Sequence, residues 1–344
     1  MMRCLTLAQT LSKEGAEINF VCRELPGHGI SLIIANGFNV IPLSYSQEDA
    51  EATEHLPLYQ RWLGTTQENE LAQVGTILKD LNGSIDWLVV DHYALDSRWE
   101  KQFKPNTRHL MVIDDLANRR HECDLLLDQN FYSNQSLRYA KLAPENCIQL
   151  LGPHYALLRD EFACERKNAK VRDKLDKVLI FFGGADLTNE TKKAILACLK
   201  VPNIKHIKVV VGYANPHKEE IQSLCALYNN LSYYCNAQNM AELMADVDLA
   251  IGAGGSTTWE RCCMGLPAVV IPIAENQVES ASALDSAGII KKIDGLHEQD
   301  LVAYLQFLGA NLSALTAMSE KCFATVDGKG AKRVATAMIT INRS

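Results

Sequence analysis

Short apolar runs rich in Val, Ile and Leu alternate with helical stretches along this 344-residue chain. Runs such as 177–181 and 268–271 show no polar alternation, which is typical of strands buried on both faces of a parallel sheet. Parallel strands need crossover connections, and helical patterns fall between most of the runs. This alternation predicts an α/β protein built from doubly wound parallel sheets.

The spacing of these patterns predicts two domains, because a chain of this length exceeds what one hydrophobic core usually supports. Charged residues dominate 159–176, where no strand signal occurs. We therefore predict an N-terminal Rossmann-like domain over 1–158, a linker over 159–176, a second Rossmann-like domain over 177–326 and a C-terminal helix over 327–344. Predicted strands are 18–22, 38–42, 87–90, 109–113, 125–127, 177–181, 205–211, 231–234, 249–251 and 268–271, and predicted helices include 2–13, 191–199, 218–228, 239–245, 257–264 and two segments within 312–344.

Charge and cysteine usage exclude several classes of function. A net charge of −7 argues against a basic surface for nucleic acid. No apolar run reaches the 18 or so residues that cross a bilayer, and no signal peptide is recognisable, so we expect a cytoplasmic protein without membrane insertion. The eleven cysteines form no CxxC pair and no zinc-like spacing, which predicts reduced cysteines, mostly in the core, and neither a metal nor a cofactor.

The start of the sequence departs from the doubly wound pattern. A helix is predicted over 2–13 and the first strand only over 18–22. In such a domain the first helix follows a first strand, which lies where the strand order reverses, and the loop between them carries binding or catalytic groups. The sequence therefore predicts an N-terminal domain whose first strand is missing.

Two glycine-containing turns follow predicted strands in the second half. The strand 177–181 leads into Gly183, Gly184 and Asp186, and the strand 249–251 leads into a turn over 252–257 that opens a helix. Glycines let a backbone approach a ligand closely, and N–H groups at a helix start favour an anion such as a diphosphate. Either turn alone also fits an ordinary strand-to-helix connection, but the pair favours a nucleotide site.

The residues of the second turn suggest how a nucleotide would be held. Ser256 or Thr257 could cap the helix, the N–H groups and hydroxyls could cradle a diphosphate, and Glu260 could accept hydrogen bonds from a ribose diol. The turn is neither the dinucleotide fingerprint nor a P-loop. After the strand 268–271, Asn276 and Gln277 suit sugar hydroxyl or acetamido groups, with a plain helix cap as the alternative. The predicted binding residues of this half are Gly183, Gly184, Asp186, Gly254, Gly255, Ser256, Thr257, Glu260, Asn276 and Gln277.

Polar residues also end two strands of the first half. Asp91 and His92 are a candidate acid/base pair, and Tyr93 could stack on a ligand or hydrogen-bond to it. Asp114 and Asp115 point in opposite directions if they end a strand, which favours loop bonding over a joint metal site. Further expectations concern Arg119, Arg120 and His121, taken as solvated surface, and Trp99 and Phe103, taken as core.

These residues together resemble the UDP-sugar hydrolases of the pseudaminic acid pathway, which are relatives of the glycosyltransferase that forms lipid II. The resemblance implies a GT-B fold, in which two Rossmann-like domains face a cleft. It also implies hydrolysis of UDP-2,4-diacetamido-2,4,6-trideoxy-β-L-altropyranose by water, with inversion at the anomeric carbon. The segments that carry the resemblance are 2–8, 20–24, 90–96, 99–100, 113–117, 123–130, 152–162, 182–186, 252–260 and 274–277.

The resemblance also defines the expected catalytic groups and partners. The family's water-activating histidine lies in a glycine-rich loop directly before the segment that matches 2–4, so it would precede Met1. Tyr93, His92 and Asn276 are then the remaining candidate contributors to catalysis, with His28 a weaker one. The expected partner is a UDP-sugar, bound by a monomer or weak homodimer. Alternatives are a UDP-sugar glycosyltransferase and a non-catalytic nucleotide-sugar-binding protein.

Overall fold

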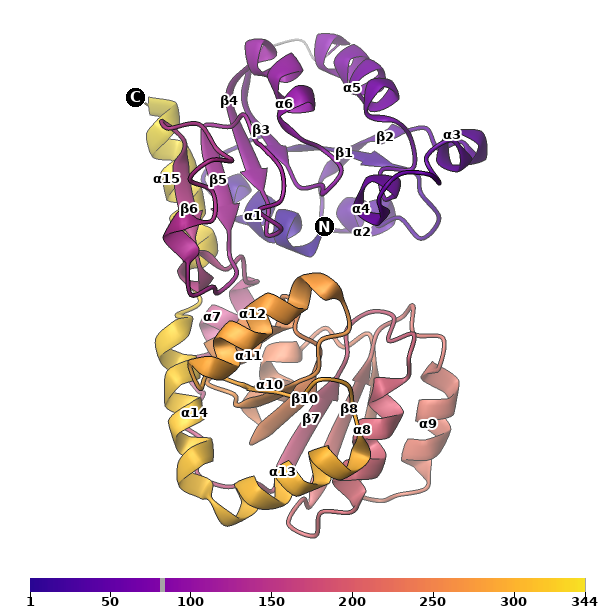
Figure 1. The fold of residues 1–344 in the computed structure, drawn as a ribbon, viewed down its shortest axis with the longest axis vertical. Helices are drawn as coiled ribbons and strands as arrows, with labels where there is room; N and C mark the ends of the chain where they lie inside the picture. Colours follow the sequence, from indigo (N-terminus) through magenta and orange to yellow (C-terminus); the bar gives the residue numbers. More distant parts are fainter. Residues whose placement is uncertain (81–83, 344) are drawn as a thin grey trace. The chain divides into compact units, whose positions relative to one another are not determined.

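The computed structural model describes residues 1–80 and 84–343, which form two compact units (Figure 1). Unit 1 comprises Met1–Asn130, Asn134–Leu157 and Gly330–Ser344, and unit 2 comprises Phe131–Ser133 and Leu158–Lys329. The stretch 159–176, expected as a linker, lies within unit 2 and contains a helix. The C-terminal helix returns to unit 1. The fold therefore places the domain boundary near residue 158, with a second crossing near residue 329.

Unit 2 is built on one six-stranded parallel sheet with the order β12-β11-β10-β7-β8-β9. The chain runs from β7 outward to β8 and β9 and then returns to β10 on the other side of β7, so the strand order reverses between β7 and β10. The predicted strands of this half are confirmed to within two residues at each end, and only the short β12 escaped prediction. The strands are β7 (Lys177–Phe181), β8 (His206–Val211), β9 (Leu231–Cys235), β10 (Leu249–Gly252), β11 (Ala268–Val270) and β12 (Lys291–Lys292).

Helices cover the sheet of unit 2 because its strands are apolar on both faces. Val178 and Ile180 of β7, for example, pack in one core cluster with Ala194 and Leu301 from two helices. The predicted helices are confirmed in type and position, including two helical segments at the C-terminus. The helices of unit 2 are α7 (Asp160–Glu165), α8 (Glu190–Leu199), α9 (Lys218–Ala226), α10 (Met240–Ala245), α11 (Thr257–Cys263), α12 (Glu275–Ser286), α13 (Glu298–Ala310) and α14 (Leu312–Thr325).

The parallel strands of unit 1 fall into two separate sheets. Strand β1 (Asn19–Arg23) pairs with β2 (Asn39–Leu43), and the second sheet has the order β3-β4-β5-β6. Within residues 1–80 and 84–343, no ladder joins β1 to β3. The interruption lies where a doubly wound domain has its first strand, which agrees with the strand predicted to be missing. The second sheet comprises β3 (Ile85–Val90), β4 (Thr107–Ile113), β5 (Leu125–Asp128) and β6 (Ile148–Leu151), of which β6 was not predicted.

The sheet β3–β6 buries both faces, as strand β4 illustrates. Leu110 and Val112 belong to the core cluster on one face, and Met111 and Ile113 belong to the cluster on the other. Helices α1 and α15 lie side by side on the second face (Figure 1). The helical elements of unit 1 are α1 (Met2–Lys13), α2 (Ile30–Ala35), α3 (Gln47–Glu51), α4 (Leu58–Arg61), α5 (Gln67–Asp80), α6 (Ser97–Phe103), η1 (Lys104–Asn106), η2 (Gln135–Leu137), η3 (Pro153–Tyr155) and α15 (Gly330–Arg343).

Aromatic and cysteine side chains test the expected core. Trp99 and Phe103 are buried with their ring centroids 4.5 Å apart, so their prediction as core residues is confirmed. All eleven cysteines are unpaired thiols. Cys147 and Cys198 are buried as expected, but Cys235 is exposed, because it is the last residue of the edge strand β9.

No single helix in the described segments is long and apolar enough to cross a bilayer, and only the pair Glu298–Ala310 with Leu312–Asn342, bent by 96°, passes on length and composition together.

Candidate functional site

Three turns of unit 2 follow the neighbouring strands β7, β10 and β11, so they meet at one edge of the sheet. The first two turns flank the point where the strand order reverses. In open α/β sheets, ligands bind outside the carboxyl ends of the strands at such a point. The structure thus brings the predicted binding residues of the second half to a single edge.

The turn after β7 presents open backbone. Gly183 has φ +87°, a left-handed conformation that favours glycine, and a Cβ placed on Gly183 or Gly184 would meet no atom within 4 Å. Gly212, after β8, is instead tightly packed, because a Cβ there would collide with the backbone of Gly184. Gly212 therefore supports this turn from behind, while the two turn glycines leave room for a ligand.

Asp186, a predicted binding residue, is hydrogen-bonded to the start of the helix that follows its turn. Its buried carboxylate accepts hydrogen bonds from the N–H groups of Glu190 at 2.9 Å and Thr191 at 3.0 Å. It also accepts one from the Thr191 hydroxyl at 2.6 Å. These bonds satisfy donors at the start of α8, so Asp186 fixes the turn to the helix. Any contribution to a ligand would be through the position of the turn.

The turn after β10 leads directly into α11. Gly252 is tightly packed, because a Cβ there would collide with the carbonyl oxygen of Phe181 on the adjacent strand. Ser256 is exposed at the N-cap position, but its hydroxyl makes no capping hydrogen bond, contrary to the helix-cap expectation for this residue. The Ser256 hydroxyl is thereby left at the surface of the turn, where a ligand could meet it.

Gln277 ties the second turn to the third. Its Oε1 accepts hydrogen bonds from the N–H groups of Gly254 and Ile273, both at 3.1 Å. Asn276, its neighbour in the first turn of α12, is half-buried. We predicted a direct sugar contact for both amides. In the structure the side-chain carbonyl oxygen of Gln277 already accepts two backbone hydrogen bonds. The N–H group of Gly254 is therefore not available to a phosphate.

Arg261 is a residue that the sequence analysis missed. It is buried, and its Nη2 donates to the carbonyl oxygen of Ala253 at 2.7 Å and to the Thr258 hydroxyl at 2.9 Å. Burial lowers the pKa of its guanidinium to about 10. Arg261 fixes the curvature of the turn after β10 from inside the unit. The signal in the sequence was a charged residue on the buried side of α11, one position after Glu260.

Glu260 lies in the first turn of α11. Burial raises the pKa of its carboxyl, and the nearby guanidinium of Arg159 acts in the opposite direction. The two side chains approach to 3.6 Å between Arg159 Nη2 and Glu260 Oε1. A carboxylate beside a glycine turn is suited to accept hydrogen bonds from a diol, provided that it is ionised.

Unit 1 carries its own group of polar residues where β3 ends. Asp91 is paired with Arg3 of α1, with Arg3 Nη2 at 2.6 Å from Asp91 Oδ1, and Arg3 Nη1 lies 3.1 Å from Asp115 Oδ2. Burial opposes ionisation of Asp91, but Arg3 outweighs it and holds the pKa of the carboxyl below its usual range. Asp91 is therefore paired with Arg3, which makes it poorly suited to exchange a proton with His92, and their acid/base pair stays a prediction.

His92 and Tyr93 are poorly suited to act as bases. The Nδ1 of His92 accepts a hydrogen bond from the N–H of Ala94 at 3.1 Å, and burial lowers its pKa. Burial raises the pKa of the Tyr93 phenol, with Asp115 adding to the effect. Tyr93 therefore stays protonated, and its hydroxyl is hydrogen-bonded to Asp115. Its ring packs edge-on against Tyr59, with centroids 5.5 Å apart.

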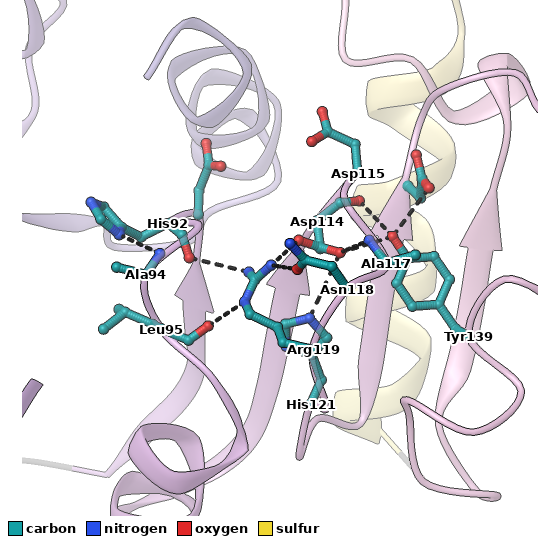
Figure 2. A network of polar contacts seen from close by, with 12 residues as sticks. His92, Ala94, Leu95, Asp114, Asp115, Ala117, Asn118, Arg119, His121 and Tyr139 are labelled. Atoms are coloured by element: carbon teal, nitrogen blue, oxygen red, sulfur yellow. Dashed lines mark hydrogen bonds and ion pairs between the residues drawn. The ribbon is translucent and has the colours of Figure 1, made fainter. Parts of the chain in front are cut away.

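A buried ionic network lies beside this group, around Asp114 at the end of β4 (Figure 2). Arg119 Nη1 lies 2.6 Å from Asp114 Oδ1, while Asp114 Oδ2 accepts from the N–H of Ala117 at 2.9 Å and from the hydroxyl of Tyr139 at 3.0 Å. Arg119 also donates to the carbonyl oxygens of Leu95 and His92, at 2.7 and 3.3 Å. Arg119 thus bridges the ends of β3 and β4.

His121 completes the network, so the expectation of solvated surface for Arg119 and His121 is wrong. The His121 side chain is fully buried, with Nδ1 at 2.7 Å from Glu100 Oε1 and Nε2 at 3.7 Å from Asp114 Oδ2. Burial alone would lower its pKa, but the two carboxylates raise it to about 9. Asp114 and Asp115 diverge as expected. Across the described ranges, no three or more His, Cys, Asp or Glu side chains are arranged to hold a metal ion.

The charge of His121 predicts a pH-dependent stability. Its folded-state pKa of about 9 exceeds the reference value of 6.5, so its contribution is complete below pH 6.5 and is lost as the pH rises toward 9. We expect the free energy of unfolding of unit 1 to fall by roughly 2–3 kcal/mol over that range. Urea unfolding at several pH values would measure it. In His121→Gln the decline should flatten; an equally steep decline would exclude His121 as its source.

Comparison with known proteins finds similarity to nucleotide-sugar enzymes. Residues 178–334 match the glycosyltransferase family 28 C-terminal domain. The UDP-2,4-diacetamido-2,4,6-trideoxy-β-L-altropyranose hydrolase of Campylobacter jejuni is 29% identical over 201 residues, which cover 58% of this chain and 71% of that protein. The spore coat polysaccharide biosynthesis protein SpsG of Bacillus subtilis is 25% identical over 299 residues, covering 84% of this chain and 86% of its own.

Solved structures support the same relationship at the level of the fold. MurG of Acinetobacter baumannii superposes with a TM-score of 0.65 at 16% identity, covering 98% of this chain and 95% of that one. The spinosyn rhamnosyltransferase SpnG, complexed with thymidine diphosphate, also gives a TM-score of 0.65 at 16% identity, covering 98% and 96% of the two chains. The predicted fold class is confirmed: the chain has the GT-B fold with two Rossmann-like domains. The resemblance to the UDP-sugar hydrolases is confirmed as well.

Proposed function

We propose that this relative of the UDP-sugar hydrolases hydrolyses UDP-2,4-diacetamido-2,4,6-trideoxy-β-L-altropyranose to UDP and the free sugar, with inversion at the anomeric carbon. The observation that carries the proposal is the meeting of three turns at the reversal point of the unit 2 sheet, next to open backbone at Gly183 and Gly184. The substrate follows from the Campylobacter relative.

The turn residues can be given roles in this reaction. Water attacks the anomeric carbon, the bond from that carbon to the diphosphate oxygen breaks, and UDP leaves with the electron pair. Because Gln277 accepts the N–H of Gly254, the diphosphate is left with the backbone of Gly255 and Thr257 and the exposed hydroxyl of Ser256. Hydrogen bonds aimed at the developing charge lower the barrier. Glu260 accepts from the ribose diol.

The remaining roles concern the sugar and the water. Asn276 is proposed to contact an acetamido group of the sugar. The base that activates water is, in this proposal, the family's histidine, in a loop ahead of the segment beginning at Met2. The interruption between β1 and β3 supports this placement, because such a loop would follow a strand at that position. His92 is less suited, since its Nδ1 is already hydrogen-bonded.

UDP binding should depend on Gln277. Gln277→Leu removes the acceptor of two backbone N–H groups, so we expect the turn after β10 to loosen and the Kd for UDP to rise about tenfold. Isothermal titration calorimetry measures the Kd. Ser282→Ala, at a half-buried serine of the same helix, is the matched control and should leave the Kd unchanged. An unaltered Kd in Gln277→Leu would show that this amide does not organise the site.

A UDP-release assay separates the three candidate activities. The assay compares the given chain with one extended ahead of Met1 by a strand and a Gly-x-Gly-His loop, using the altrose-configured substrate in water. A hydrolase releases UDP without any added acceptor. Release that requires an acceptor would favour a glycosyltransferase, and UDP binding without release by either chain would favour a nucleotide-sugar-binding protein.

A further inference from the structure

Arg159 stands next to Glu260, although the two residues lie about a hundred positions apart in sequence. The Nη2 atom of Arg159 is 3.6 Å from Oε1 of Glu260, and the Glu260 side chain keeps only 18% of its surface exposed. A carboxylate at this depth loses much of its hydration, so a neighbouring cation has a larger effect on it than at the open surface.

Arg159 itself is held in place by its own segment. Its Nη1 lies 2.7 Å from Oε1 of Glu161, and its guanidinium carbon lies 5.3 Å from the centroid of the Phe162 ring. Phe162 is fully buried and provides a rigid surface beneath the guanidinium. Arg159 is thus oriented independently of Glu260 and is available to act on it.

The other charged groups around Glu260 do not substitute for Arg159. Arg261 also lowers the pKa of Glu260, to a smaller extent than Arg159, while its Nη2 donates to the carbonyl oxygen of Ala253 and the Thr258 hydroxyl. Glu161 carries a like charge, which disfavours ionisation of Glu260. Burial raises the pKa of Glu260, and the positive charge of Arg159 has the largest opposing effect. Arg159 is therefore the group that most favours the ionised state of Glu260.

We propose that Arg159 is a positioning residue that holds Glu260 as an oriented carboxylate, ready to accept hydrogen bonds from the ribose diol of a uridine diphosphate. This inference rests on the proposed function, in which Glu260 recognises the ribose. It assigns ribose recognition to a pair of residues, of which only one touches the ligand. The guanidinium sets the charge and direction of the carboxylate, so its removal acts on diol recognition rather than on the diphosphate.

The proposal is tested by the affinities of UDP and 2′-deoxy-UDP for the full chain between pH 5 and pH 8. Arg159→Gln should raise the Kd for UDP roughly tenfold at pH 7, because a hydrogen bond to an ionised carboxylate is stronger than one to a neutral carboxyl group. The preference for UDP over its deoxy analogue should shrink toward unity. The midpoint of the acid-side loss of UDP binding should move to higher pH, since Glu260 protonates more readily without Arg159.

Arg159→Lys keeps a cation and should retain most of the preference for UDP over 2′-deoxy-UDP. This variant distinguishes the loss of the charge from a general folding defect. Lys200→Gln removes a positive charge that pairs with Glu298 elsewhere in unit 2, and it should leave both affinities unchanged. Equal weakening of UDP and 2′-deoxy-UDP, with the same acid midpoint, would overturn the positioning role. If wild-type protein fails to bind UDP at all, the proposed function itself fails.

Discussion

Replacing Asp114 with Asn is expected to lower the free energy of unfolding of unit 1 by about 3–5 kcal/mol, the usual cost of breaking a buried ion pair from one side. The substitution retains the shape of the side chain but removes its charge. Arg119, 2.6 Å away, and protonated His121, 3.7 Å away, then lose the anion between them. Chemical denaturation at pH 7, followed by the fluorescence of buried Trp99 in unit 1, measures the change.

Glu122→Gln is the matched control for this prediction. Glu122 also pairs with a cation, Lys104 at 3.1 Å, but the pair is partly exposed, so its loss should cost at most about 1 kcal/mol. Similar small losses in both variants would mean that the network around Asp114 is well solvated or rearranges freely. His121→Gln in the Asp114→Asn background should add less than it does alone, because the two residues share one interaction.

The sequence predicts unit 2 well because its strands are continuous apolar runs, which only a covered parallel sheet can bury. The run 177–181 coincides with β7, and the glycines after it mark the end of the strand. Strand β12 has no such signal, because Lys291 and Lys292 are half-buried at the edge of the sheet. The sequence predicts Gln277 as a site residue, but its bond to Gly254 depends on two turns meeting in space and cannot be inferred from local pattern.

The polar interior of unit 1 was harder to predict. Arg119 and His121 look like surface residues in sequence, since the carboxylate partner of His121, Glu100, is 21 positions away on α6. Only the fold brings α6 to the loop after β4. The sequence does not show whether neighbouring residues of opposite charge are buried or exposed. A buried ionic network of this kind can therefore be recognised only in the tertiary structure. The missing first strand of the doubly wound pattern could be predicted from the sequence, because that prediction rests only on the order of strands and helices along the chain.

Restoring a strand between β1 and β3 is expected to stabilise unit 1 by roughly 3–5 kcal/mol, since burial of about five apolar side chains and two new ladders should exceed the cost of ordering them. The change is a fused segment ahead of Met1 that carries a five-residue Val/Ile strand and a short loop. Val21 of β1 is 38% exposed, and Trp87 and Val89 of β3 are only half-buried, so apolar surface is available on both sides. Urea unfolding measures the gain.

The start of α1 lies at the carboxyl-terminal edge of β3, where a loop from an added parallel strand would have to arrive. The amino group of Met1 is 3.7 Å from Asp91, directly after the last residue of β3, so a parallel strand would deliver its loop to that edge. A fused segment of equal length made of Gly and Ser is the control and should add no stability. Hydrogen exchange should show new protection at amides of both β1 and β3. Protection on one strand only, or none, would mean that the two edges do not accept a common strand, and the histidine loop would then have no such strand to support it.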